Sequence, residues 1–303
     1  MSDTATLYQD SVSPAEAVDR LWGLVNTPAS KDNSQHLKLT EAGGRILAKT
    51  LSAPIDLPPT NNAAVDGYAV DSAFLATNPG HAFPVIGRAA AGHPFTEDVP
   101  AGSAIRIFTG GVMPTGTDAV AMHEFCTLQN SNGDTTPVVT LDRPVTCGTN
   151  NRPAGENLRR GEAIIGAGTR LDAADIGIAA AAGISELPVH RSLIVGLLSM
   201  GDEIAEPGAH TKAGQIHDSN RPMLAELLAN ESFIVRDFGI APDSLETLTE
   251  KFTLALSHCD VVLSSGGASD GDEDHTQAAM RAAGAETVFW RLAIKPGRPM
   301  SAG

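Results

Sequence analysis

The sequence has few cysteines, and their arrangement narrows the classes of protein it can encode. Its three cysteines are odd in number, lie far apart and form no Cys-x-x-Cys pair. The pattern therefore supports neither a disulfide framework nor a structural zinc site. The nine histidines include no His-x-x-x-His pair, so a soft-metal centre has no support either. We expect Cys126, Cys147 and Cys259 to be reduced, part-buried thiols.

Positive charge and long apolar runs are also scarce. The chain has 21 Lys and Arg against 36 Asp and Glu, a formal net charge of -15. This balance argues against a broad surface for nucleic acid or anionic membrane, because both partners require a positive field. The longest apolar run, residues 176–184, is too short to cross a bilayer, and the first residues do not resemble a targeting segment. We expect a soluble, cytoplasmic protein with neither nucleic acid nor membrane as a partner.

The length of 303 residues exceeds what one hydrophobic core usually serves, so two or three domains are expected. Prolines at 54, 58 and 59 break the chain early and fit a domain boundary. Short β-rich runs such as 103–108 and 137–141, separated by turn residues, predict a small β domain. We predict a discontinuous helical or mixed N-terminal domain (10–56 and 151–188), an inserted small β domain (57–150) and an α/β domain (189–303).

Two helices are predicted in the first of these domains. Ser13 precedes Pro14 and stands three residues before Glu16, an arrangement typical of a helix N-terminus. The apolar side chains that follow form one stripe along this helix: Val18, Leu21, Trp22 and Val25. The Ala-rich stretch 172–183 predicts the second helix.

After Pro188 the pattern alternates between apolar strands and helices. The predicted strands are 193–198, 233–238, 260–264 and 287–290. A helix over 243–258 is predicted to begin with Asp243 and Glu246 as a capping box. The alternation predicts an α/β fold with a parallel-rich sheet.

Ligands of such sheets bind beyond the carboxyl ends of the strands, which directs attention to 199–203 and 264–275. The second segment begins Ser264-Ser265-Gly266-Gly267, and glycines there let backbone N–H groups approach a phosphate. Its acidic residues could equally cap a helix after a tight turn. As hard oxygen ligands they could instead hold Mg²⁺, for which Glu203 and Asp274 are the best candidates.

Other segments hold candidate binding residues. Arg291, Lys295 and Arg298 concentrate positive charge in an acidic chain, which predicts an anion pocket or, alternatively, a cationic surface loop. Asp66-Gly67 and Thr109-Gly110-Gly111 carry polar groups beside glycines, although each is also an ordinary turn former.

Taken in order, these segments resemble the molybdopterin molybdotransferase family, to which the C-terminal domain of the animal scaffold gephyrin belongs. The resemblance runs along the chain from Ser13 to Gly303. The segments that carry it are 62–69, 106–114, 150–156, 161–171, 201–203, 214–220, 264–274 and 289–299.

The resemblance implies a multidomain homodimer, with a three-layer α/β/α molybdopterin-binding domain and an active cleft formed by two subunits. It implies a transferase of molybdenum cofactor biosynthesis that inserts molybdate into adenylylated molybdopterin, uses Mg²⁺ and releases AMP. Molybdopterin adenylyltransferase would be the upstream partner. The resemblance further implies molybdate as a substrate and Mg²⁺ as the cofactor.

The resemblance also implies roles for matching residues. Those expected to affect activity are Asp66, Thr109, Glu203, Asp243 and Asp274, with Glu203 and Asp274 nearest the metal. Those expected to bind substrate are Ser265, Gly266, Gly267, Arg291, Lys295 and Arg298. The chemistry implied is cleavage of a phosphoanhydride by positioning and charge neutralisation.

The sequence departs from the family pattern in two ways. Asn61 and Asn157 stand where the family usually has an acidic residue, so two negative charges are missing near the inferred cleft. The family continues past this point with a Gly-Leu-Pro-Gly-Asn-Pro motif and a small C-terminal β domain, which leads us to expect a truncated chain. A pterin-binding scaffold without turnover, or another nucleotide hydrolase on the same fold, are the alternatives.

Overall fold

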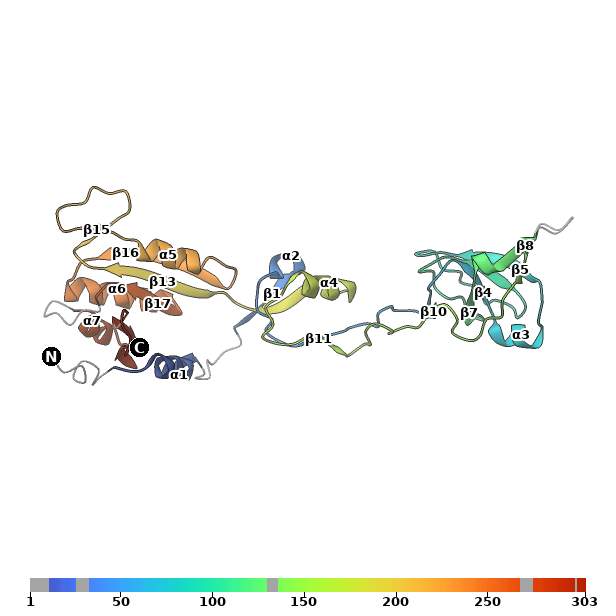
Figure 1. The fold of residues 1–303 in the computed structure, drawn as a ribbon, viewed down its shortest axis with the longest axis horizontal. Coiled ribbons are helices and arrows are strands. Elements are labelled where there is room, and N and C mark those ends of the chain that lie inside the picture. The colour runs from blue at the N-terminus through green and yellow to red at the C-terminus, as the bar shows by residue number, and fades with distance from the viewer. Residues whose placement is uncertain (1–10, 26–32, 130–135, 268–274, 298) are drawn as a thin grey trace. The chain divides into compact units, whose positions relative to one another are not determined.

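The computed structural model describes residues 11–25, 33–129, 136–267, 275–297 and 299–303. It is a mixed α/β structure (Figure 1). The chain divides into two compact units. The parallel-sheet unit comprises Met1–His36, Gly44–Ala48 and Pro188–Gly303. The mixed-sheet unit comprises Leu37–Gly43 and Lys49–Leu187. The finer division into three domains stays a prediction.

The mixed-sheet unit is built on six strands in the order β7-β4-β6-β5-β9-β8. Strands β5 and β6 are parallel, and the other neighbouring pairs are antiparallel. The predicted β runs at 103–108 and 137–141 are confirmed, each a little shorter than expected. The strands are β4 (Gly67–Val70), β5 (Phe83–Ala89), β6 (Ala104–Ile107), β7 (Ala119–Met122), β8 (Cys126–Gln129) and β9 (Val138–Leu141).

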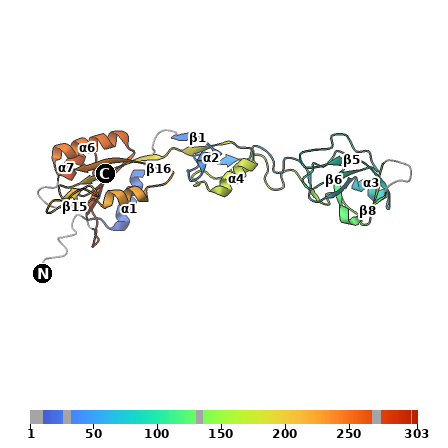
Figure 2. The ribbon, with the colours of Figure 1, turned by 90° about the horizontal axis from the view of Figure 1, so that it is seen from above.

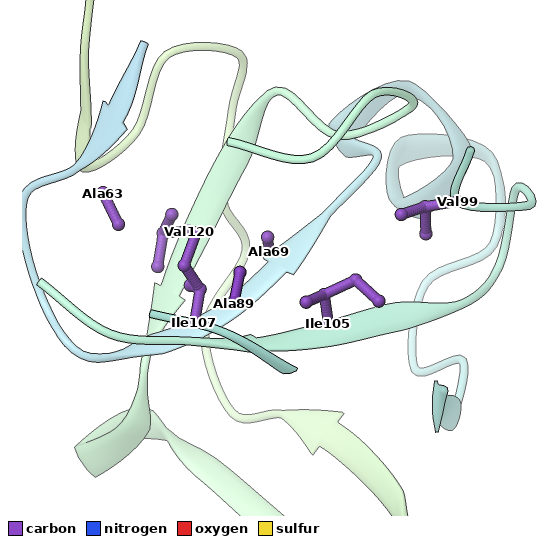
Figure 3. Packing of buried hydrophobic residues seen from close by; sticks show 7 residues of the cluster. All are labelled: Ala63, Ala69, Ala89, Val99, Ile105, Ile107 and Val120. Atoms are coloured by element: carbon purple, nitrogen blue, oxygen red, sulfur yellow. The ribbon is translucent and has the colours of Figure 1, made fainter. Parts of the chain in front are cut away.

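Small and β-branched side chains form one core of this unit (Figure 3). Within β6, Ile105 and Ile107 are fully buried in it, whereas Arg106 points to the other face because successive strand residues alternate. A second cluster, which includes Phe83 and Val139, packs with Leu75 of α3 (Ser72–Thr77). Apolar side chains of this sheet are therefore buried in two separate clusters.

Shorter elements complete the mixed-sheet unit. Its two-stranded pairs are β2 (Leu51–Ser52) with β11 (Ala163–Ile165) and β3 (Asn62–Ala63) with β10 (Asn151–Arg152). Its other helices are α2 (Leu39–Ala42), the 3-10 turn η2 (His123–Phe125) and α4 (Ala173–Ala181). The helix predicted over 172–183 is confirmed, and Asp172 and Asp175 form a capping box at its start. Strands β1 (Ser34–Lys38) and β12 (Glu186–His190) pair with each other, and both contain a unit boundary.

The parallel-sheet unit has the predicted parallel sheet, in the order β16-β13-β17. Its strands are β13 (Leu193–Met200), β16 (Phe233–Ala241) and β17 (Val261–Ser265). The fourth predicted strand is not part of it: β18 (Phe289–Arg291) instead pairs antiparallel with β19 (Pro299–Ala302). Phe289 is buried there against Val12, Ala17 and Leu292, so its apolar character serves a separate cluster. A short parallel pair, β14 (Ile204–Ala205) with β15 (Ile216–His217), follows β13.

Helices α5 (Asn220–Leu227), α6 (Leu245–His258) and α7 (Thr276–Ala282) accompany this sheet. Leu248 and Phe252 of α6 pack with Leu198, Met200, Ala241 and Ala279 in one core. The predicted capping box at Asp243 was wrong: α6 begins at Leu245, and its N-cap, Ser244, makes no side-chain cap bond. The Asp243 N–H donates instead to the Asp202 carboxylate, at 3.3 Å.

Helix α1 (Pro14–Val25) begins as predicted, but its apolar stripe is largely uncovered. The Glu16 N–H donates to Ser13 Oγ at 3.2 Å, which confirms the cap. Most of the predicted stripe is exposed, with Trp22 at 60% and Val25 at 67%. Only Leu21 of that stripe packs against the cluster around Phe289. The spacing of apolar residues predicts which side chains share a face of the helix. It does not predict whether other residues of the chain pack on that face.

The three cysteines carry free thiols. Cys126 and Cys259 are part-buried as predicted, and burial raises the pKa of Cys126 to about 11. The prediction for Cys147 was wrong, because this residue is exposed. None of the helices in the described residues has both the length and the apolar character needed to span a bilayer.

Candidate functional site

The carboxyl ends of the three parallel strands bring several predicted residues to one edge of the sheet. Glu203 follows β13, Asp243 follows β16, and Ser265 ends β17. The loops after the first two strands are in contact, since the Gly201 N–H donates to the Ala241 carbonyl at 3.1 Å. This edge is where ligands of parallel sheets bind.

The turn after β17 has a geometry that only glycine fits. Gly266 and Gly267 have φ angles of 93° and 57°, in the left-handed region. A Cβ at Gly266 would lie 2.1 Å from the Met200 carbonyl oxygen, and one at Gly267 would lie 2.0 Å from Thr276 Oγ1. These contacts require both glycines whether or not the turn binds an anion. The close packing fixes the turn against β13 and the start of α7.

The Glu203 side chain folds back over the turn that follows β13. A Cβ added at Gly201 would lie 2.4 Å from Glu203 Oε2, so the carboxylate occupies the space that a larger residue there would need. Glu203 is exposed while Gly201 is buried. The carboxylate is therefore available to a ligand at this edge of the sheet.

A buried arginine that we did not single out from the sequence lies beside these residues. Arg221 is 8% exposed and pairs with Asp218 at 2.9 Å, with Glu206 at 2.6 Å and with Asp237. Its hydrogen bond to Asp237 lowers the pKa of that carboxyl. The pairs tie the first turn of α5 to β16 and to the segments that flank the β14–β15 pair.

A second missed residue, Asn220, contacts a predicted one. Its Nδ2 donates to Ser265 Oγ at 2.7 Å, which joins the start of α5 to the glycine turn. The sequence contains one signal for this neighbourhood: 214–220 is among the segments that carry the family resemblance. The i, i+3 spacing of Asp218 and Arg221 also permits an ion pair at a helix start.

Asp66 and Thr109 form a separate cluster in the mixed-sheet unit. Asp66 Oδ1 accepts from the Thr109 N–H at 2.8 Å and from Thr109 Oγ1 at 2.7 Å. These two bonds, the backbone one foremost, lower the pKa of Asp66. Arg106 contributes to the same effect, and its guanidinium stacks between Tyr68 and Phe108. Asp66 is thus an exposed, ionised carboxylate held in one orientation.

The remaining predicted residues are scattered or outside the described chain. Arg291 lies in β18 and is part-buried, and Lys295 is exposed in the following turn. Asp274 and Arg298 lie outside the described residues.

The two asparagines that replace acidic family residues both use their side-chain oxygen as an acceptor. Asn61 Oδ1 accepts from the Ala154 N–H at 2.9 Å, and Asn157 Oδ1 accepts from Arg152 at 2.9 Å. A carboxylate would accept the same bonds. The replacement removes charge and leaves these local hydrogen bonds possible.

Two family models match the chain. Residues 12–183 match the MoeA N-terminal region (domain I and II), and residues 196–303 match a probable molybdopterin binding domain. The edge of the parallel sheet described above lies within the second match. The Asp66–Thr109 cluster lies within the first.

Curated relatives and solved structures agree with these matches. The molybdopterin molybdenumtransferase of Haemophilus influenzae is 39% identical over 89% of this chain, and that of Synechococcus elongatus 35% identical over 88%. The chain spans 65% and 66% of the length of these two proteins. The crystal structure of a molybdopterin biosynthesis MoeA protein from Pyrococcus horikoshii matches 96% of this chain and 71% of its own, at a TM-score of 0.83 and 29% identity. The chain belongs to the MoeA family.

Proposed function

We propose that this chain inserts molybdate into adenylylated molybdopterin and releases AMP, as a molybdopterin molybdenumtransferase. One observation carries the proposal: the glycine turn after Ser265, the Glu203 carboxylate and Asp243 share one edge of the parallel sheet, within the match to the molybdopterin-binding model. Such an edge suits a ligand with several phosphate groups.

Each part of the site has a proposed role. Backbone groups of Gly266 and Gly267, with the Ser265 hydroxyl, bind the terminal phosphate of the pterin. Arg291 and Lys295 bind the pyrophosphate or molybdate, together with Arg298, which lies outside the described residues. Asp66 and Thr109 affect turnover from the mixed-sheet unit, and Asp243 does so through the loop after β16.

Glu203 and Asp274 are proposed to hold Mg²⁺, which would neutralise charge on the pyrophosphate when bound. The donor chemistry fits, because Mg²⁺ prefers hard oxygen ligands and usually takes one or two carboxylates while substrate phosphates and water complete its shell. The exposed Glu203 carboxylate supplies one such donor. Groups of three or more acidic, cysteine or histidine side chains placed to hold a metal are absent from the described residues. We propose that oxygen atoms of the substrate and of water complete the shell of the metal.

Finer features of the fold and assembly are part of the proposal. A three-layer α/β/α arrangement is supported by Figure 2, where α6 and α7 lie on one side of the parallel sheet and α5 on the other. A homodimer, which light scattering would test, and an upstream molybdopterin adenylyltransferase are both carried by the resemblance. A location in the cytoplasm is also part of the proposal, and it rests on the first residues, which do not resemble a targeting segment.

The test measures AMP release from adenylylated molybdopterin with molybdate, with and without Mg²⁺. Glu203→Gln removes a charge and little volume, so we expect AMP release to fall about 100-fold while molybdopterin binding is kept. The matched control is Glu250→Gln, the same change at an exposed position on α6. If the unaltered chain binds the pterin but shows no Mg²⁺-dependent AMP release, the chain is a pterin-binding scaffold and not a transferase. Normal turnover in Glu203→Gln would leave Glu203 without a role.

A further inference from the structure

The hydrogen bond between Asn220 and Ser265 determines what the Ser265 hydroxyl can do. A hydroxyl has one hydrogen to donate and two lone pairs to accept. Asn220 Nδ2 donates to Ser265 Oγ at 2.7 Å, so this contact uses a lone pair. The hydroxyl hydrogen must then point away from Asn220, because Asn220 already places its own hydrogen between the two atoms.

The surroundings of the Ser265 hydroxyl, next to the glycine turn, indicate where its hydrogen can donate. Within the described residues, Asn220 is the one hydrogen-bond partner of the Ser265 side chain. Gly266 and Gly267 follow directly and have no side chain to accept the bond. Met200 and Thr276 lie so close to these two positions that they leave no room for a Cβ there. The hydroxyl is thus a donor without a described acceptor, beside a turn whose backbone N–H groups suit an anion.

We propose that Asn220 is a positioning residue that fixes the Ser265 hydroxyl as a donor to the phosphate bound at this turn. The proposal rests on the proposed function, since that function supplies the phosphate. Asn220 itself acts through Ser265. A fixed donor binds an anion more tightly than a freely rotating hydroxyl, because no orientation is lost on binding.

The neighbouring residue explains why Asn220 keeps this position. Arg221 is 8% exposed and holds the first turn of α5 through its ion pairs with Asp218, Glu206 and Asp237. The Arg221 backbone N–H also donates to Asp218, at 3.1 Å. The ion pairs thereby anchor the backbone next to Asn220.

The test compares molybdopterin with its dephosphorylated form as ligands of the full chain. Asn220→Asp replaces the donor with an acceptor, so the Ser265 hydrogen turns toward the new carboxylate, and a negative charge is added near the phosphate. We expect affinity for molybdopterin to fall at least about tenfold. Asn220→Ala frees the hydroxyl to rotate, and we expect a loss of about threefold. Both variants should bind the dephosphorylated ligand as the unaltered chain does, which a general disturbance of the fold would not permit.

Three variants complete the experiment. Ser265→Ala should lose affinity for molybdopterin as Asn220→Asp does. Asn230→Asp is the matched control, because this residue lies just beyond the other end of α5 and its side-chain oxygen accepts from the Ser232 N–H, as a carboxylate also would. Combining Asn220→Ala with Ser265→Ala should cost no more than Ser265→Ala alone.

Each outcome decides between the two proposals. Unchanged affinity in Asn220→Asp, with a loss in Ser265→Ala, overturns the role of Asn220 and leaves the proposed function intact. Equal losses for both ligands also overturn it. If the unaltered chain binds inorganic pyrophosphate with the same dependence on Asn220 but does not bind molybdopterin, the proposed function fails and the role of Asn220 stands. Binding of neither ligand overturns both.

Discussion

Asp66 in the mixed-sheet unit and Asp218 in the parallel-sheet unit are both held in the charged state, by different means. Asp66 is exposed, and two hydrogen bonds from the uncharged Thr109 lower its pKa. Asp218 is 4% exposed. Burial alone would raise its pKa, and the hydrogen bonds that it accepts, including those from Arg221, lower the pKa by more.

This difference distinguishes charged groups that stabilise the fold from charged groups that are available to bind a ligand. Arg221 already neutralises part of the charge on Asp218, so that carboxylate stabilises the structure. Asp66 keeps its full charge toward solvent, because neutral donors orient a carboxylate without cancelling it. Changes at buried charges should therefore alter stability, whereas changes at the exposed candidate site residues should alter binding or turnover. The four predictions below test this, from the largest expected effect to the smallest.

Arg221→Met should have the largest effect on stability. The change leaves Asp218 buried without its cation, and breaking a buried ion pair in this way costs about 3–5 kcal/mol. Hydrogen exchange should show lost protection in the parallel-sheet unit and unchanged protection in the mixed-sheet unit. Arg236→Met, at an exposed arginine of the same strand as Asp237, is the control and should change little. A loss below about 1 kcal/mol would contradict the structural role.

Asp66→Asn should reduce turnover without reducing stability. The amide oxygen can accept both bonds from Thr109, so only the charge is removed, and we expect AMP release to fall roughly 100-fold. Thr109→Val keeps the backbone bond and removes the side-chain one, so it should raise the pKa of Asp66 part of the way to its usual value. Titration of the carboxyl by NMR measures this. If Asp66→Asn lost as much stability as Arg221→Met, the proposed difference between Asp66 and Asp218 would be wrong.

Lys295→Ala should weaken ligand binding about tenfold and leave stability unchanged. The residue is exposed, and a charge-assisted bond to an anion is typically worth about that factor. The measurement is affinity for adenylylated molybdopterin at two salt concentrations, since screening should reduce the difference. Lys212→Ala, at another exposed lysine of the parallel-sheet unit, should have no effect. Normal affinity in the Lys295 variant would mean that Lys295 faces solvent and does not contact the ligand.

Asp260→Asn should have the smallest effect, because its ion pair with Arg191 is only part-buried. Two bonds of 2.5 and 2.6 Å join the pair and, by favouring the carboxylate, lower the pKa of Asp260 from 3.8 to about 2. The folded state then gains stability from the charge above pH 4, about 1 kcal/mol after screening, and loses it as the pH falls from about 4 through about 2. Urea unfolding at pH 7 and at pH 2.5 measures this. A difference from the unaltered chain that persists undiminished at the lower pH would contradict the linkage.

Local pattern predicted most of the fold, and tertiary packing decided the rest. The strands of the parallel sheet and the capped helix at Ser13 follow from alternating apolar runs and capping residues that act within a few residues. The exposed face of Trp22 and Val25 could not be predicted, because covering it depends on segments far along the sequence. The same holds for β18, whose apolar residues identify a strand but not its partner.

The sequence predicted where two candidate residues lie in the fold, and their roles stay a prediction. Glu203 and Ser265 were expected at strand ends, and they lie there. Arg221 was missed because nothing in its local sequence distinguishes a buried arginine from an exposed one; its carboxylates come from three separate segments. The capping box at Asp243 failed for a related reason, since the Asp243 N–H bonds to Asp202 from a different loop.

The order of the two units along the chain has a consequence for synthesis. The mixed-sheet unit is complete by Leu187, whereas the central strand of the parallel sheet begins only at Leu193 and its last neighbour ends at Ser265. A ribosome adds residues from the N-terminus, so the first unit can form while the second is still being made. Helix α1 belongs to the parallel-sheet unit but is translated before the mixed-sheet unit, and the residue that it packs against, Phe289, emerges far later. Until then Ala17 and Leu21 lack the contact with Phe289 that the described structure gives them.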